Sequence, residues 1–112
     1  MTTVHPELKR GSTEMLILVL LGESERHGYE ILKLLDERSE GLLRFHIGSV
    51  YPILFRLERR GWIRGRWDGQ RGGRRRRIYR LTRDGARALR DEKSGWVRFV
   101  AAVNRIAGIQ HA

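Results

Sequence analysis

The sequence contains no cysteine among its 112 residues. This absence excludes disulfide bonds, thiolate zinc sites, iron–sulfur clusters and cysteine nucleophiles, and it suits a reducing compartment. Long apolar segments are also missing: the longest run is Met15 to Leu21, far below the roughly 20 residues that cross a bilayer. Residues 1–10 lack a secretory pattern. We therefore expect a cytoplasmic protein with no membrane partner.

Motifs for catalysis and metal binding are absent as well. The four histidines lack the paired spacing of a zinc site, no serine lies in a nucleophile elbow, and no GxxxxGK phosphate loop occurs. We expect no metal, no cofactor and no enzymatic activity. The length allows one domain with a modest core and little room for a deep catalytic cleft.

What the sequence does contain is a clustered positive charge. The net charge is +10, and residues 56–90 hold 14 arginines against three acidic residues, whereas the rest of the chain is nearly neutral. A surface selected for solubility alone would mix the two signs more evenly. A confined field of arginines attracts a polyanion and neutralises phosphates. The charge pattern therefore favours nucleic-acid binding over a merely solvated face.

Apolar periodicity and capping residues predict a mainly α fold with a small β-hairpin. After a loose arm over residues 1–11, helices are expected at about 12–21, 27–39, 47–60 and 82–107, with strands at 62–68 and 75–81. Pro52 suggests that the third helix begins properly near Ser49. This order is that of a winged helix-turn-helix, a DNA-binding domain over residues 1–81, followed by a long C-terminal dimerisation helix over 82–112.

Two apolar surfaces have no cover within so short a chain. Residues 15–21 are apolar all round, and the last helix carries an apolar stripe with near-heptad spacing. We expect a homodimer in which the last helix packs against the first helix of the partner. The residues predicted at this interface are Leu18, Leu89, Trp96, Val100, Val103 and Ile106.

Three segments resemble a known family. They read HGYEI at 27–31, GSVYPIL with RLE at 48–58, and GGRRRRIYRLT at 72–82 followed by Gly85. In this order they resemble the PadR-type bacterial transcriptional regulators over about residues 8–107, and in particular the short subfamily that dimerises through one long helix. The resemblance implies a dimeric repressor that binds double-stranded DNA.

The helix, the hairpin and the resemblance together select the candidate DNA contacts, several of which also have plainer interpretations. Ser49 could simply cap its helix, Tyr51 could be a half-buried core aromatic, and Arg56 could pair with Asp68 or Glu58. The arginines at 74–77 could form a solvated hairpin tip. The predicted DNA-binding residues are Ser49, Tyr51, Pro52, Arg56, Arg59, Arg74, Arg75 and Arg76. Position 55, usually polar in relatives, is Phe55, which packs against the linker or touches DNA less specifically.

The resemblance also implies a small-molecule effector, because some short members bind flat aromatic drugs at the dimer centre. The candidate effector residues are Met15, Val19, Trp96, Phe99 and Val100. Their alternative role is packed core, with Trp96 a plain anchor of the dimer. The leading hypothesis is thus a sequence-specific, dimeric repressor released by a small aromatic effector. The alternative is a basic architectural protein that binds nucleic acid without sequence preference.

Overall fold

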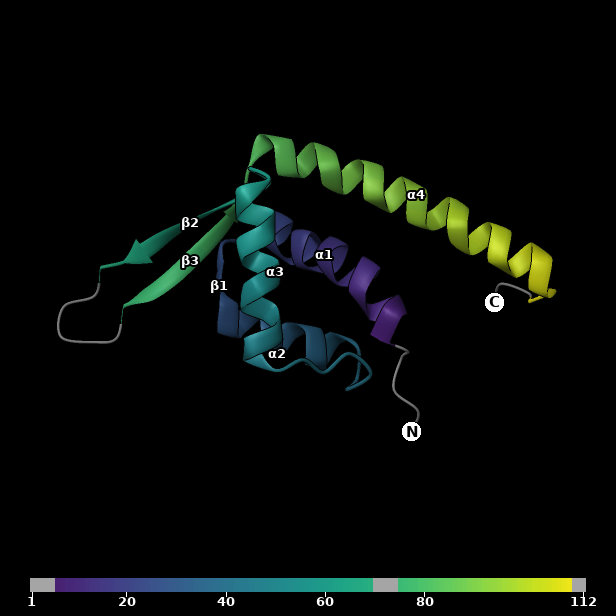
Figure 1. Ribbon diagram of the computed structural model, residues 1–112, viewed down its shortest axis with the longest axis horizontal. Helices are drawn as coiled ribbons and strands as arrows, with labels where there is room; N and C mark the ends of the chain where they lie inside the picture. The colour runs from purple at the N-terminus through teal and green to yellow at the C-terminus, as the bar shows by residue number, and fades with distance from the viewer. Residues whose placement is uncertain (1–5, 70–74, 110–112) are drawn as a thin grey trace.

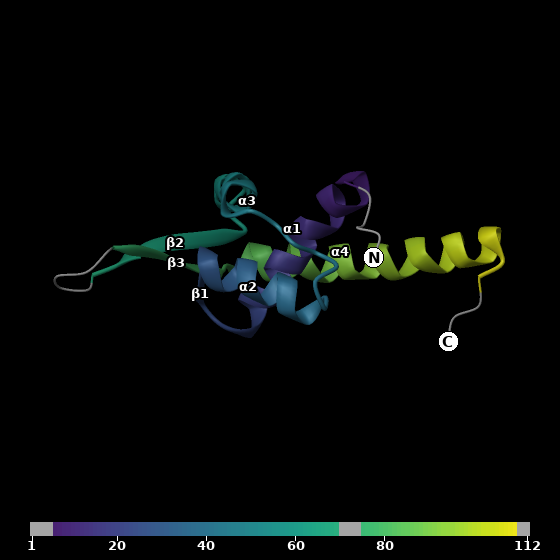
Figure 2. The same ribbon diagram turned by 90° about the horizontal axis from the view of Figure 1, so that it is seen from below.

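The computed structural model describes residues 6–69 and 75–109. Its helices are α1 (Pro6–Glu23), α2 (Gly28–Arg38), α3 (Ile47–Arg59) and α4 (Arg83–Ala107), and its strands are β1 (Arg26–His27), β2 (Ile63–Asp68) and β3 (Arg76–Leu81). The fold is mainly α with a small sheet, as predicted. Helices α1 to α3 form a body, the β2–β3 hairpin projects from it as a wing, and α4 runs away in the opposite direction (Figures 1 and 2).

The apolar stripe predicted on the third helix forms the centre of the core. Val50, Leu54 and Leu57 of α3 are fully buried, and they pack with Ile17 of α1 and Ile31 of α2 in one cluster. Burying a side chain of this size contributes about 1.5–3 kcal/mol. This cluster fixes which side of α3 faces inward, and hence which side faces solvent.

The sheet has three strands rather than the two expected from the sequence. Its order is β1-β3-β2 with all pairs antiparallel, and β1 pairs Arg26 with Tyr79 and His27 with Ile78. Strand β1, which lies between the first two helices, was not predicted from the sequence. A two-residue strand has no periodicity of its own, so it exists only because β3 lies alongside it.

The start of α1 differs from the sequence expectation, whereas α3 begins at the predicted residue 47 and not at the later start suggested near Ser49. Helix α1 begins at Pro6 rather than after an arm over residues 1–11, in agreement with the preference of proline for a first helical turn. Helix α3 begins at Ile47, with Pro52 inside it. The amide that Pro52 lacks would have bonded the Gly48 carbonyl, and Gly48 is exposed, so this unmade bond does not leave a buried polar group.

The direction of α4 is fixed where the helix begins. Thr82 caps it as predicted, since its hydroxyl oxygen accepts a hydrogen bond from the Gly85 amide at 3.0 Å. The same hydroxyl donates to the Gly61 carbonyl at 2.6 Å. A Cβ atom at Gly85 would overlap the carbonyl oxygen of Trp62. Helix α4 therefore lies directly on the chain between α3 and β2, and only a glycine fits at the contact.

Among the described residues, none of the helices has the length and apolar character needed to span a bilayer. The same part of the chain contains no group of three or more histidine and carboxylate side chains placed to hold a metal ion.

Candidate nucleic-acid interface

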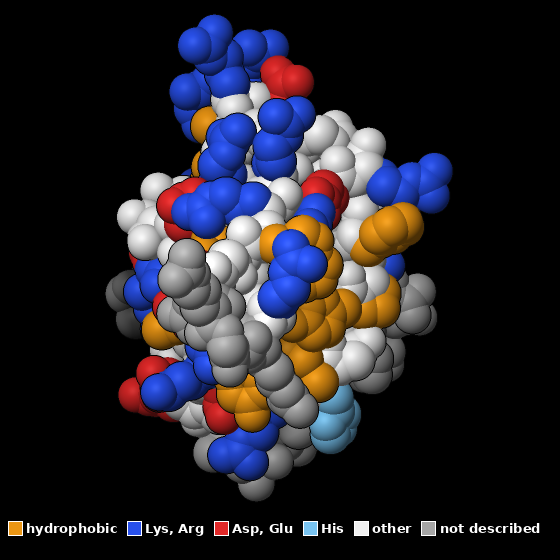
Figure 3. Space-filling model, turned by 90° about the vertical axis from the view of Figure 1, so that its left-hand side faces the viewer, with side chains coloured by type: hydrophobic (Ala, Val, Ile, Leu, Met, Phe, Trp, Pro, Cys, Tyr) orange, Lys and Arg blue, Asp and Glu red, His pale blue; other side chains and the backbone are white. Residues whose placement is uncertain are grey.

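The outward side of α3 carries an apolar centre with cations around it. Opposite the buried stripe lie Pro52, Phe55 and Arg59, all exposed. The Phe55 side chain is 62% exposed, so it does not pack against the linker, which was one of its two expected roles. The Arg59 guanidinium lies 5.8 Å from the centre of the Phe55 ring. The space-filling view from the wing end shows Lys and Arg side chains, most of them in the upper half, and an exposed hydrophobic patch near the centre (Figure 3).

One edge of α3 is held to α1 by ion pairs. Glu14 of α1 lies 2.7 Å from Arg60 and 3.6 Å from Arg56. The Glu14 side chain is only 17% exposed, whereas both arginines remain more than 40% exposed. The alternative in which Arg56 pairs with Asp68 or Glu58 was wrong, since its carboxylate partner is Glu14. Arg56 instead stands beside α1 at the rim of the outward face.

The other edge of α3 is joined to the wing. Glu58 accepts a hydrogen bond from the Arg77 guanidinium at 2.7 Å and another from the Gly65 amide at 3.1 Å. Arg77 also lies over the rings of Trp67, at 5.3 Å, and Tyr79, at 5.9 Å. A Cβ at Gly65 would collide with the Arg77 guanidinium. These contacts set the angle between the wing and α3.

Sequence reasoning missed this connection, since it treated Arg77 as one of four similar arginines. A glycine inside a predicted strand marks a close approach, and Gly65 was the available signal. Burial raises the pKa of the adjacent Tyr79, Glu58 and Tyr51 add to the rise, and Arg77 opposes it. Tyr79 therefore stays neutral and serves as part of the wing's base.

The remaining wing cations are open to solvent. Arg75 and Arg76 are exposed, and Arg75 lies 5.5 Å from the Trp67 ring. Arg74, also expected to contact DNA, lies outside the described residues. On the other strand, Arg66 forms an ion pair with Glu25 at 3.0 Å.

A groove of about 690 Å³ lies between the wing, the start of α2 and the start of α3. Tyr51 lines it and is 46% exposed. One side of the Tyr51 ring packs on Gly28, where an added Cβ would lie 3.2 Å from the ring. The residue thus has both a packed face and an open face. Ser49 is exposed at the start of α3, and the helix cap there is His46, which corrects the alternative that Ser49 is the cap.

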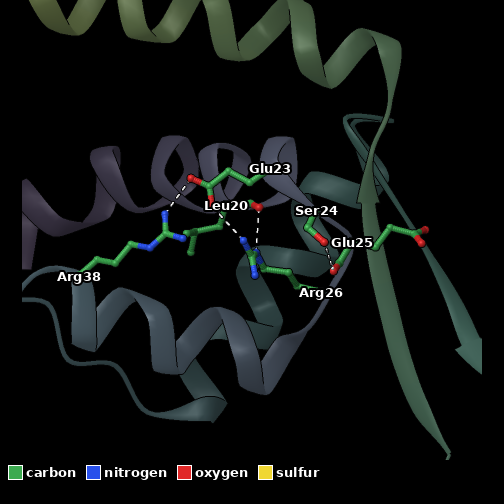
Figure 4. A network of polar contacts seen from close by, with 6 residues as sticks. All are labelled: Leu20, Glu23, Ser24, Glu25, Arg26 and Arg38. Carbon is green, nitrogen blue, oxygen red and sulfur yellow. Dashed lines mark hydrogen bonds and ion pairs between the residues drawn. The ribbon is translucent and has the colours of Figure 1, made fainter.

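The turn between α1 and α2 is fastened by a charged network at Glu23 (Figure 4). Arg26 and Arg38 donate to the two Glu23 oxygens at 2.9 and 2.8 Å. Arg26 also donates to the Leu20 carbonyl at 3.0 Å. The Arg38 hydrogen bond, more than any other contact, lowers the pKa of Glu23. The network keeps α2 in place beside α1 and therefore positions the start of α2 next to the wing.

The candidate effector residues do not all lie together. Met15, Trp96 and Phe99 line a shallow hollow of about 260 Å³ between α1 and α4, with Glu92 and Gly95. The Trp96 and Phe99 rings lie 6.0 Å apart. Val19 lines a separate groove with residues such as Leu34 and Leu43, and its effector role stays a prediction. Val100 is half-buried on α4 one turn beyond Trp96.

The predicted interface residues also divide into two groups. Leu18 is fully buried within its own chain, which corrects its assignment to a dimer interface, and Leu89 packs against the same core. Beyond them the apolar stripe of α4 is open. Trp96 is 42%, Val103 is 38% and Ile106 is 88% exposed.

A three-helix body, an antiparallel wing and a solvent-facing helix surrounded by arginines define a winged-helix DNA-binding protein. The Transcriptional regulator PadR-like family matches residues 17–91. The chain belongs to this family and is a DNA-binding transcriptional regulator.

Individual relatives agree with this assignment. A PadR family transcriptional regulator from Eggerthella lenta is 31% identical with a TM-score of 0.82, over 93% of this chain and 88% of that one. A transcriptional regulator from Clostridium thermocellum is 27% identical with a TM-score of 0.85, over 92% and 97%. PadR from Bacillus subtilis, solved in complex with operator DNA, is 29% identical with a TM-score of 0.65, over 70% and 45%. An uncharacterized protein from Lysinibacillus sphaericus is 28% identical over 93 residues, 83% of this chain and 85% of that one.

Proposed function

We propose that the protein is a homodimeric repressor that binds a specific operator and leaves it when a small aromatic molecule binds. The observation that carries the DNA-binding part is the joint placement of α3 and the wing. Glu58 ties Arg77 of the wing to α3, so the wing, with its exposed Arg75 and Arg76, is held beside α3. A helix of this kind enters the major groove of DNA, while the wing contacts the neighbouring phosphate backbone of the DNA.

The proposed DNA contacts divide by chemistry. Arg75 and Arg76 of the wing contact phosphates, as does Tyr51 through its hydroxyl group. The contacts of α3 with the base edges and the flanking backbone come from Ser49, Pro52, Arg56 and Arg59. Arg74 keeps its assignment to phosphate contact on the basis of the sequence. The solved complex of the B. subtilis relative with operator DNA supports an operator as the target.

The open half of α4 supports the dimer. Its exposed side chains include Trp96, Phe99, Val103 and Ile106, and burying each of them contributes about 1.5–3 kcal/mol. A partner that covers this stripe would bring a second copy of α3 into position. Two such helices read successive major grooves when they are about 34 Å apart.

The hollow at Met15, Trp96 and Phe99 is the proposed effector site. An aromatic ligand can stack on Trp96, and each offset-stacked pair contributes about 0.5–1.5 kcal/mol beyond area burial. Glu14 lies near both this hollow and α3. Burial is the main cause that raises the pKa of Glu92 in the hollow, Glu14 adds to the rise, and Glu14 also pairs with Arg56 and Arg60. A ligand releases DNA only if it binds the DNA-free conformation of the protein more tightly than the DNA-bound conformation.

A gel-shift experiment tests the regulatory function. The intergenic DNA upstream of the gene is compared with random duplexes of equal length and base composition, at several salt concentrations. We expect the intergenic DNA to bind at least about 1,000-fold more tightly, within the usual range of specific recognition. Equal affinity for both duplexes would instead favour the architectural alternative.

Tryptophan fluorescence tests the effector site. Planar dyes and phenolic acids are titrated into the wild type and into Trp96→Ala, and Trp62 and Trp67 provide the unchanged background signal. We expect quenching that the substitution removes, together with loss of operator binding at the same ligand concentrations. Equal quenching of both proteins would place the ligand elsewhere.

A further inference from the structure

Phe55 is a large apolar side chain at a place where a DNA-binding helix normally presents polar groups. It is 62% exposed, and its neighbours along the same row of α3 are Pro52, three residues before, and Arg59, four residues after. At about 100° per residue these three positions lie opposite the buried stripe of Val50, Leu54 and Leu57. Phe55 is therefore central on the outward face.

The surroundings of Phe55 favour a nucleic acid as the surface that covers it. Arg59 lies over the ring, Arg56 flanks it at the rim, and the segment 56–90 has a net charge of +11. An apolar protein surface would have to desolvate these cations, whereas DNA supplies phosphates for them. The Phe55 ring, in contrast, needs an apolar group of the DNA to pack against.

The major groove offers such a partner at one base. Each base edge presents nitrogen and oxygen donors and acceptors there, and thymine adds the C5 methyl group. A phenyl ring pressed against a polar edge would leave that edge without a hydrogen bond. Pro52 cannot donate a hydrogen bond to this base edge either, because it has no amide hydrogen.

We propose that Phe55 is a specificity-determining residue that recognises the C5 methyl group of a thymine in each operator half-site. The assignment rests on the proposed function, since it requires α3 to lie in the major groove. Phe55 selects thymine because its ring gains apolar contact from the methyl group and desolvates any other base at the same position.

Two steps test this proposal. First, duplexes that bind the wild type are selected from a pool of random sequences. Second, each thymine of the selected duplex is replaced in turn by deoxyuridine, which removes only the methyl group. We expect one position in each half-site to weaken binding about three- to fivefold, the effect of losing one buried methyl group, and the two together about tenfold or more.

Variants at position 55 test whether the sensitivity to deoxyuridine depends on the Phe55 side chain. Phe55→Leu retains an apolar side chain and should keep the sensitivity to deoxyuridine at the same positions. Phe55→Gln should bind the thymine and deoxyuridine duplexes equally. Position 55 is exposed, so both variants should keep the wild-type circular dichroism spectrum, which checks their folding.

The outcomes separate the inference from the function on which it rests. If no sequence is enriched in the selection, the proposed operator recognition fails, and the inference fails with it. If a sequence is enriched but every deoxyuridine is tolerated, operator recognition stands and the role of Phe55 is overturned. Sensitivity that persists in Phe55→Gln would also overturn it.

Discussion

The winged-helix body and the distal half of α4 use apolar residues in opposite ways. In the body, Leu18, Leu54 and Leu57 have no exposed surface, whereas beyond Gly95 the helix exposes Trp96 and Ile106. An uncovered helix gains little stability from propensity alone. The body thus has the contacts it needs to fold, whereas the distal part of α4 leaves its apolar side chains uncovered.

The two regions also differ in how their glycines are used. Gly85, at the base of α4, touches the backbone of the body, whereas Gly95, in the distal part, has open space where a Cβ would lie. One glycine is therefore a packing requirement and the other is not.

Gly85→Ala should have the largest effect on stability. The new Cβ would overlap the Trp62 carbonyl oxygen and approach the Leu81 side chain, so the start of α4 must move. We expect a loss of about 3 kcal/mol in the free energy of unfolding, measured by urea denaturation. The control is Gly95→Ala, which should add about 1 kcal/mol by improving helix propensity. Similar stability for the two variants would contradict the tight contact at Gly85.

Val103→Asp should disrupt the proposed dimer while leaving the body folded. A carboxylate in the middle of a buried apolar stripe costs several kcal/mol, so the dissociation constant should rise 100-fold or more. Light scattering should give the mass of the 13.1 kDa chain instead of twice that value. Val97→Asp is the matched control, since Val97 is 66% exposed and lies on another side of α4. A wild type that is monomeric at micromolar concentration would refute the dimer.

Arg75→Ala combined with Arg76→Ala should weaken DNA binding without changing the oligomeric state. Each phosphate contact contributes about 0.9 to the slope of log affinity against log salt concentration, so the slope should flatten by about 1.8. Affinity should fall for operator and random DNA alike, as measured by fluorescence anisotropy. An unchanged slope would mean that these two arginines are not phosphate contacts.

Glu58→Gln should loosen the wing from α3. The variant loses a charge-assisted hydrogen bond to a side chain that is 29% exposed, which should lower the free energy of unfolding by about 1–2 kcal/mol. Glu25→Gln removes the same charge from the exposed ion pair with Arg66 and should cost under about 0.5 kcal/mol. If urea denaturation gives the same loss in the free energy of unfolding for both variants, the hydrogen bond between Glu58 and Arg77 stabilises the fold no more than an exposed ion pair does.

Glu92→Gln should have the smallest effect, and the size of this effect depends on pH. Burial is the main cause that raises the pKa of Glu92, and Glu14 adds to the rise. Folding therefore favours the protonated form, so stability falls as the pH rises through the pKa of the folded state. The variant should melt slightly higher than the wild type at neutral pH. The difference in melting temperature should vanish below the ordinary pKa of a glutamate. A difference that is constant at all pH values would contradict the raised pKa of Glu92.

Much of the fold followed from local patterns. The stripe of Val50, Leu54 and Leu57, the Thr82 cap and the turn-rich hairpin each depend on residues close in sequence. The concentration of arginine in residues 56–90 indicated nucleic acid before any element was placed. These inferences held because helix periodicity, capping and charge density are properties of short segments.

The partners of individual side chains did not follow, because they depend on contacts between distant segments. Strand β1 exists only beside β3, and Arg56 meets Glu14 across 42 positions of sequence. Met15 and Val19 are four residues apart on α1, yet they line different hollows. The amino-acid sequence by itself thus determined the class of fold, the cap of the last helix and the positive charge of the segment expected to face DNA. Only the tertiary structure decided which arginines are held by carboxylates and that Phe55 stands open at the centre of α3, since both depend on how helices and wing pack in space.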